Sequence, residues 1–89
     1  MLFEWDEAKR AANLKKHGFD LLDAALLFDG RPVITYPSPR DGEGRFVTVG
    51  ILAETFAAVV WTERNDAIRL ISLRKARNEE RQAHHSRYG

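Results

Sequence analysis

The stretch RFVTVGILAETFAAVVWTERNDAIRLISL, residues 45–73, decides the fold of this chain. Three runs within it are rich in β-branched and aromatic residues and predict strands: 45–52, 55–62 and 67–73. The connections between these runs are short enough for hairpins, so the strands are expected to form an antiparallel meander. Val59, Val60 and Trp61 are apolar in succession, which is typical of a central strand covered on both faces.

Two helices are predicted before the meander. Asp6 can cap a helix over residues 7–16, because its carboxylate accepts unpaired backbone N–H groups, and Gly18 can end that helix. Asp20 can cap a second helix, whose apolar stripe runs to Phe28.

The remaining elements complete an α+β pattern. Residues 33–36 predict a short strand, residues 40–44 a turn or loop, and residues 75–87 a final helix by propensity. We therefore expect one domain over residues 1–89, with two N-terminal helices, an antiparallel sheet of three to four strands and a C-terminal helix.

Composition narrows the class of protein. The chain has 89 residues, of which 44% are hydrophobic and 30% charged, as in soluble globular proteins. It has no window of about 18 apolar residues that could span a bilayer, and its acidic start is unlike a signal peptide. It also has no cysteine, which excludes disulfides and thiolate chemistry. We expect a cytoplasmic protein without membrane contact.

Charge is unevenly distributed, although the net charge is only +1. Residues 1–30 hold four Lys or Arg against six Asp or Glu, whereas residues 69–89 hold six against two. A basic end of this kind suits a polyanion such as RNA. The alternative is a solvated helix that carries many charges.

The final helix offers candidates for RNA binding. Four side chains recur at steps of four, three and four, which places them on one helix face: Arg77, Arg81, His84 and Tyr88. Arg69 and Arg74 add basic groups just before it. Guanidinium groups bind phosphate, and Tyr or His can stack on a base.

Candidates for catalysis lie after the first helix and at predicted strand ends: Lys16, His17, Glu63, Arg64, Arg74 and Lys75. Attack of a 2′-OH on RNA needs a base, an acid and cations that neutralise the phosphorane, and Arg or Lys can supply the cations without metal. His17 or Glu63 could transfer the proton. His17 could instead be a partner of the helix dipole. The groups meet only if the first helix packs at that edge of the sheet.

No metal or cofactor is expected. His84 and His85 are adjacent, so on a helix they point about 100° apart and cannot easily share an ion. Gly42-Glu43-Gly44 lacks the Lys and Ser or Thr of a phosphate-binding P-loop.

The motifs taken together resemble those of a known family, the BrnT toxins. At the start these motifs are Phe3-Glu4-Trp5-Asp6, Lys9, Asn13 and Lys16-His17-Gly18; later they are Phe28-Asp29, Arg45-Phe46, Gly50, Thr62-Glu63-Arg64 and Ile68–Ala76. The resemblance implies a compact RelE-like fold and metal-independent RNA cleavage that stops translation. It also implies a BrnA antitoxin with a ribbon-helix-helix domain, through which the complex would bind DNA and repress its operon.

On this interpretation we expect Arg64 and Arg74 on the scissile phosphate, with Lys16 and Lys75 assisting. Two alternatives remain. The chain could be a module that binds a partner and nucleic acid without catalysis, or an inactivated toxin that acts in operon repression. RNA fragments that end in a 2′,3′-cyclic phosphate would distinguish the enzyme from both.

Overall fold

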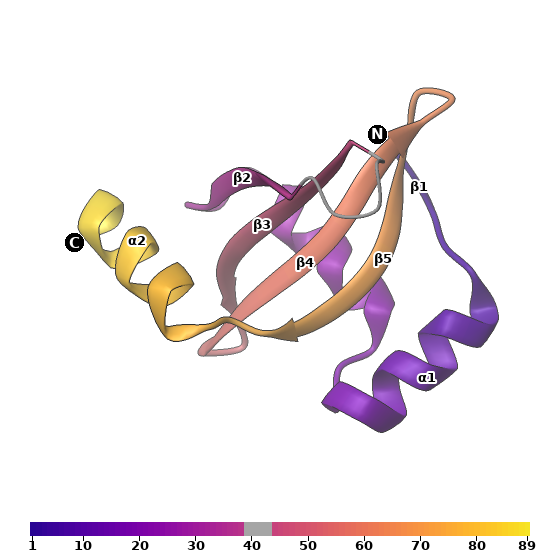
Figure 1. The fold of residues 1–89 in the computed structure, drawn as a ribbon, viewed down its shortest axis with the longest axis horizontal. Coiled ribbons are helices and arrows are strands. Elements are labelled where there is room, and N and C mark those ends of the chain that lie inside the picture. Colours follow the sequence, from indigo (N-terminus) through magenta and orange to yellow (C-terminus); the bar gives the residue numbers. More distant parts are fainter. Residues whose placement is uncertain (39–43) are drawn as a thin grey trace.

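The computed structural model describes residues 1–38 and 44–89. Within these ranges five strands form one sheet in the order β1-β5-β4-β3-β2 (Figure 1). The strands are β1 (Leu2–Glu4), β2 (Ile34–Ser38), β3 (Arg45–Leu52), β4 (Thr55–Arg64) and β5 (Ala67–Lys75). The helices are α1 (Glu7–His17), the 3₁₀ helix η1 (Leu21–Phe28) and α2 (Asn78–Tyr88). No helix in the described ranges combines the length and apolar character needed to cross a bilayer.

The predicted meander is present, since β3 pairs antiparallel with β4 and β4 pairs antiparallel with β5. Two residues connect each pair of strands, and both residues of each turn have positive φ: Ala53, Glu54, Asn65 and Asp66. Positive φ at both central positions is the conformation of a type I′ turn, whose twist matches that of the flanking strands.

The expected fold class, a RelE-like α+β domain with an antiparallel sheet of three to four strands, is wrong in its sheet. β1 adds a fifth strand and pairs parallel with the start of β5, from Leu2 opposite Ala67 to Glu4 opposite Arg69, so the sheet is mixed. A run of three residues is too short to show strand periodicity in the sequence. The described part of the chain therefore has three helices and a mixed sheet of five strands.

The last helix and the second helix also differ from the predictions. The final helix begins at Asn78 rather than at residue 75, because β5 continues through Lys75 in register with Ala57. The second helix forms as 3₁₀. The turn expected at 40–44 lies outside the described residues except for Gly44.

One face of the sheet is covered by η1, which lies behind it in the view of Figure 1, and α1 lies beside the outer edge of β5. Leu21, Ala24 and Leu27 of η1 are buried against Val59 and Leu70, among other residues of the sheet. Gly50 permits close approach here, because a Cβ atom at this position would lie 2.7 Å from Leu27 Cδ2 and 2.9 Å from Val33 Cγ1.

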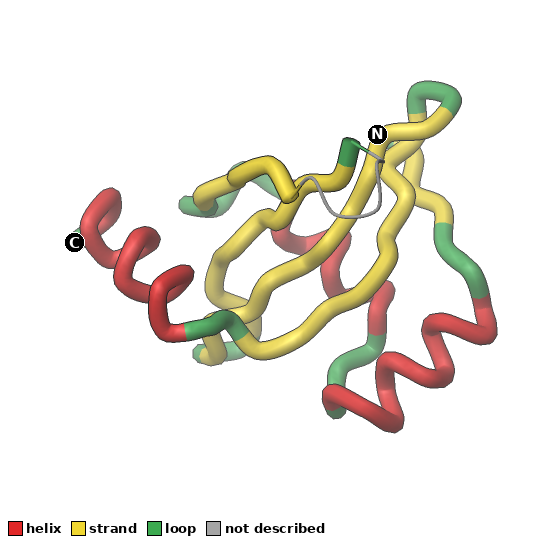
Figure 2. The backbone as a smooth tube through the Cα atoms, in the orientation of Figure 1, coloured by secondary structure: helices red, strands yellow, loops and turns green. Residues whose placement is uncertain are grey.

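The opposite face, which we call the open face, carries a smaller apolar cluster of Val47, Val49 and Ala58. α2 follows β5 and lies at one end of the molecule, away from α1 (Figures 1 and 2). Much of the open face therefore has no helix on it.

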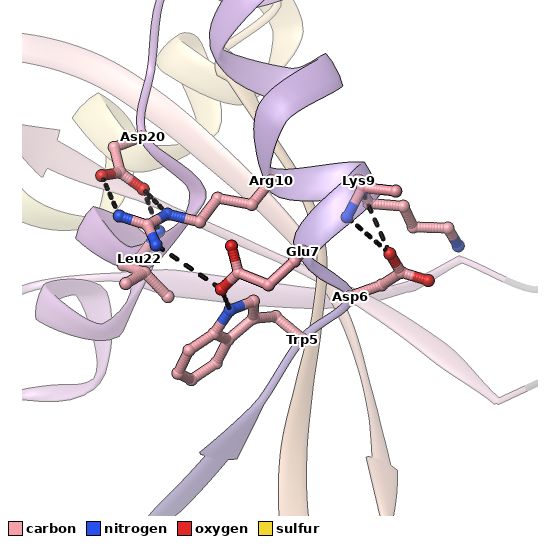
Figure 3. Close-up of polar contacts among 8 residues, drawn as sticks. Trp5, Asp6, Glu7, Lys9, Arg10, Asp20 and Leu22 are labelled. Carbon is pink, nitrogen blue, oxygen red and sulfur yellow. Dashed lines mark hydrogen bonds and ion pairs between the residues drawn. The ribbon is translucent and has the colours of Figure 1, made fainter.

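Polar contacts fix α1 at its beginning. Asp6 accepts hydrogen bonds from the backbone N–H groups of Ala8 and Lys9, as an N-cap does. Arg10 donates to both carboxylate oxygens of Asp20, at 2.9 and 3.0 Å, and so joins α1 to the start of η1 (Figure 3). The Arg10 guanidinium lowers the pKa of the Asp20 carboxyl.

The buried side chain of Asn13 attaches α1 to the sheet. Its Nδ2 donates to the carbonyl oxygens of Leu73 and Phe19, each at 3.0 Å, and its Oδ1 accepts the Leu73 N–H at 2.9 Å. Leu73 lies beyond the part of β5 that β1 covers, so Asn13 satisfies backbone groups that no strand pairs on that side.

We expect Asn13→Ala to lower the free energy of unfolding by about 1–3 kcal/mol, because the Leu73 N–H and C=O would stay buried without their partner. Chemical denaturation of the variant and of the exposed control Lys15→Ala measures the effect. Equal midpoints for the two variants would show that Asn13 does not hold α1 on the sheet.

Candidate functional site

A hollow of about 440 Å³ opens on the open face between the end of α1, the sheet and the residues before α2. We call it the basic hollow. Its basic residues are Lys16, His17, Arg45, Arg74 and Arg77; hydroxyl groups come from Tyr36, Ser38 and Ser72; and its apolar floor is Val47, Val60 and Ile71. None of the described residues that line it is Asp or Glu. The hollow therefore suits an anionic ligand.

A bulge in β5 shapes the floor of the basic hollow. Val60 pairs with Ser72 but Trp61 pairs with Leu70, so Ile71 is an extra residue in β5. Leu70 and Leu73 both point into the core under the helices. Ile71 and Ser72 consequently both face the basic hollow, where regular alternation would expose only one of them.

The end of α1 supplies Lys16 and His17. They follow Asn13 by three and four residues, so they lie on the same side of the helix as the side chain that bonds to β5. Gly18, with φ of 77°, ends the helix in a left-handed conformation directly after them. The attachment of α1 to β5 thus brings an amine and an imidazole to the edge of the sheet.

A buried carboxylate organises the opposite side of the basic hollow. Glu80, whose exposed fraction is 5%, accepts hydrogen bonds from Arg74 Nη1 at 2.7 Å and Nη2 at 2.9 Å, from the Arg77 N–H at 2.7 Å and from the Tyr36 hydroxyl. This cluster, Tyr36, Arg74, Arg77 and Glu80, joins β2, β5 and α2. We call it the Glu80 cluster.

Contacts within the Glu80 cluster shift the pKa values of its side chains. Burial raises the pKa of Glu80, but the hydrogen bonds from Arg74, the Arg77 N–H and Tyr36 outweigh it and lower the pKa to about 2. Burial, reinforced by Glu80, raises the pKa of Tyr36, so this phenol stays protonated and donates. Glu80 raises the pKa of Arg74. The carboxylate and guanidinium are thus both charged at neutral pH.

The structure brings together three of the six predicted catalytic residues, Lys16, His17 and Arg74, in the basic hollow. Glu63 pairs with Ile68, which packs in the core, so strand alternation places Glu63 on the helix-covered face. Lys75 pairs with the core residue Ala57 and lies on that face as well.

Arg64 and Arg74 lie at opposite ends of the sheet. Arg64 pairs with Ala67, whereas Arg74 pairs with Ala58, six residues away along β4, or roughly 20 Å. Arg64 is two residues beyond Thr62, which pairs with Arg45, so Arg64 shares the open face with Arg45. The two predicted phosphate ligands therefore cannot contact one phosphate together.

The predicted RNA-binding stripe of the last helix packs mainly against the protein itself. Arg81 lies over the ring of Phe56 at 5.8 Å, and buried His84 makes a 3.1 Å hydrogen bond with Pro32 O. Tyr88 donates to Val33 O at 2.6 Å. Of this stripe, Arg77 alone lines the basic hollow.

Arg69 is also engaged, since it donates to Glu4 of β1 at 3.2 Å. A second hollow, of about 520 Å³, lies beside the far end of α2 and includes Ile51, Phe56 and the ion pair of Arg31 with Asp29. The arginine hydrogen bonds lower the pKa of Asp29 to about 2. Cation and anion are balanced in this pair, so the second hollow is less suited to a polyanion.

Sequence reasoning missed Tyr36, Arg45, Ser72 and Glu80 as residues of the site. Alternation along the predicted strand 45–52 could have placed Arg45 beside Val47 on one face. The bulge that turns Ser72 outward has no signal in the residue pattern. In the sequence pattern, Glu80 is only one of the charged residues of the final helix.

We expect stability to depend on Glu80 between pH 5 and pH 2. A carboxyl group whose pKa falls from 4.5 to about 2 on folding stabilises the protein above pH 4.5, and this contribution of about 3 kcal/mol is lost as the pH falls towards 2. The free energy of unfolding of Glu80→Gln should therefore fall less over this range than that of the parent chain.

Denaturant unfolding at a series of pH values measures the difference, with the exposed neighbour changed in Glu79→Gln as the control. Curves for the parent chain and Glu80→Gln that run parallel from pH 5 to pH 2 would contradict the ion pair.

Comparison with known proteins agrees with a site for an anionic polymer. No curated protein matches the chain. Residues 5–80 match the family described as "Ribonuclease toxin, BrnT, of type II toxin-antitoxin system", and the matched range includes every residue that lines the basic hollow. The chain therefore belongs to the BrnT family of ribonuclease toxins of type II toxin–antitoxin systems.

Proposed function

We propose that this chain is an endoribonuclease that cleaves RNA without a metal ion and that the basic hollow is its active site. The observation that carries the proposal is the convergence of an imidazole with four cationic side chains from α1, β3, β5 and the residue before α2, on a part of the open face that none of the described helices covers. Membership of a ribonuclease toxin family supports it.

The reaction needs only groups of the kinds present. A base removes the proton of the ribose 2′-OH, the 2′-oxygen forms a bond to phosphorus, and the bond from phosphorus to the 5′-oxygen breaks. An acid then protonates that 5′-oxygen, which leaves a 2′,3′-cyclic phosphate and a 5′-hydroxyl. His17 is the proposed proton-transfer group, because imidazole serves as base or acid near neutral pH and Glu63 lies on the other face.

Lys16 and Arg77 are proposed to stabilise the charge that develops on the phosphorane. Arg74 is held by Glu80 and by Lys75 O, contacts that use only part of the donor set of a guanidinium, so it can still donate to a phosphate. Arg45 lines the basic hollow, and Arg64 lies beyond it on the open face. Both are proposed to bind a different phosphate of the same strand from the one that is cleaved.

The biological setting follows the family. We propose that RNA cleavage inhibits translation and growth in the cytoplasm, and that a BrnA-like ribbon-helix-helix antitoxin neutralises the toxin. An antitoxin segment that covers the cations of the basic hollow would exclude RNA. DNA would be bound through the antitoxin of the complex.

We expect the purified chain, free of any partner, to cleave single-stranded RNA in the presence of EDTA and to leave 2′,3′-cyclic phosphate ends. His17→Asn should lower the cleavage rate by about 10²–10⁴-fold, the usual contribution of a general acid or base. His85→Asn is the matched control, because His85 is exposed on α2 and does not line the basic hollow. Product ends are identified by mass spectrometry.

Cleavage that requires an added metal ion would contradict the proposed mechanism. Equal rates for His17→Asn and His85→Asn would contradict the role of His17.

A further inference from the structure

A second, smaller groove continues from the basic hollow along α1. Its volume is about 180 Å³, and it runs between α1 and the bulged part of β5. Lys16, His17, Ile71 and Ser72 line both spaces. The groove adds Lys9, Ala12 and Asn13, and we call it the α1 groove. The basic hollow and the α1 groove therefore adjoin each other along these four residues.

The α1 groove is positively charged at both ends. Lys9 and Lys16 are seven residues apart, so they lie on one side of the helix, two turns and about 10 Å from each other. None of the described residues that line the groove is Asp or Glu. Figure 3 shows the Lys9 side chain extending away from Arg10, which is engaged with Asp20 on another side of α1.

The side chains on the floor of the α1 groove carry no charge. Ala12 leaves space between the two lysines, and the Asn13 amide already bonds to the backbone of Leu73 and Phe19. Two lysine amines, with no Asp or Glu among the described residues that line the groove, suit the phosphate backbone of a nucleic acid.

We propose that the α1 groove is a binding subsite for single-stranded RNA, in which Lys9 contacts a phosphate outside the cleaved bond. The inference rests on the proposed active site and extends it. A single strand is favoured because its flexible backbone can follow the turn from the open face to the edge of the sheet beside α1, whereas an A-form duplex is stiff.

Lys9→Gln tests the subsite, with Lys15→Gln as the matched control, since Lys15 is on the same helix but lines neither space. On a long single strand, Lys9→Gln should raise KM about 3–10-fold and leave kcat unchanged, because a distant phosphate contact adds uniform binding. On a dinucleotide substrate, Lys9→Gln should behave as the parent chain does.

Binding of a long 2′-deoxy strand, followed by fluorescence anisotropy, tests the subsite independently of cleavage. Lys9→Gln should reduce the slope of log affinity against log salt by about 0.7, the value for one lost phosphate contact. Equal affinities for Lys9→Gln and Lys15→Gln would overturn the subsite, as would equal losses on the dinucleotide and the long strand. A parent chain that binds this strand but cleaves no RNA would contradict the proposed function. The affinities of Lys9→Gln and Lys15→Gln would still test the subsite in that case.

Discussion

The hydrogen bonds between the Asn13 side chain and the backbone of Leu73 are the constraint on which the candidate site depends. β1 covers only the start of β5, and beyond Arg69 the outer edge of β5 needs other partners. Asn13 donates to and accepts from the same residue, as a neighbouring strand would. Because these bonds are buried, α1 cannot rotate or slide without leaving backbone groups unpaired. Lys16 and His17, one turn further along α1, are placed at the basic hollow for this reason.

Glu80 has the corresponding role on the other side of the basic hollow. A buried carboxylate is costly unless it is paired, and here Arg74, Tyr36 and a backbone N–H satisfy it. These hydrogen bonds attach α2 to β2 and β5 and hold Arg74 in one position. The two sides of the site are thus fixed by buried polar contacts between elements distant in the sequence, and the apolar core under η1 lies on the opposite face.

Local signals were sufficient for much of the fold. Runs of β-branched and aromatic residues with short connections predicted the meander, and Asp6 predicted the start of α1. The parallel strand β1 was missed because three residues carry no periodicity, and its partner β5 is about 65 positions away. For the site, the sequence pattern did not show on which face of the sheet each candidate residue lies. The bulge at Ile71 and the packing of the last helix depend on tertiary contacts, which separate Glu63 from His17 and bury His84.

The central claim is that RNA is bound and cleaved in the basic hollow. The most direct test is a crystal structure of the chain with a single-stranded RNA in which a 2′-methoxy group replaces the attacking hydroxyl. We expect the phosphate next to the modified ribose to lie within hydrogen-bond distance of Lys16 and His17, on the open face of the sheet. A strand bound instead across the outer surface of α2, or on the face covered by η1, would contradict this claim.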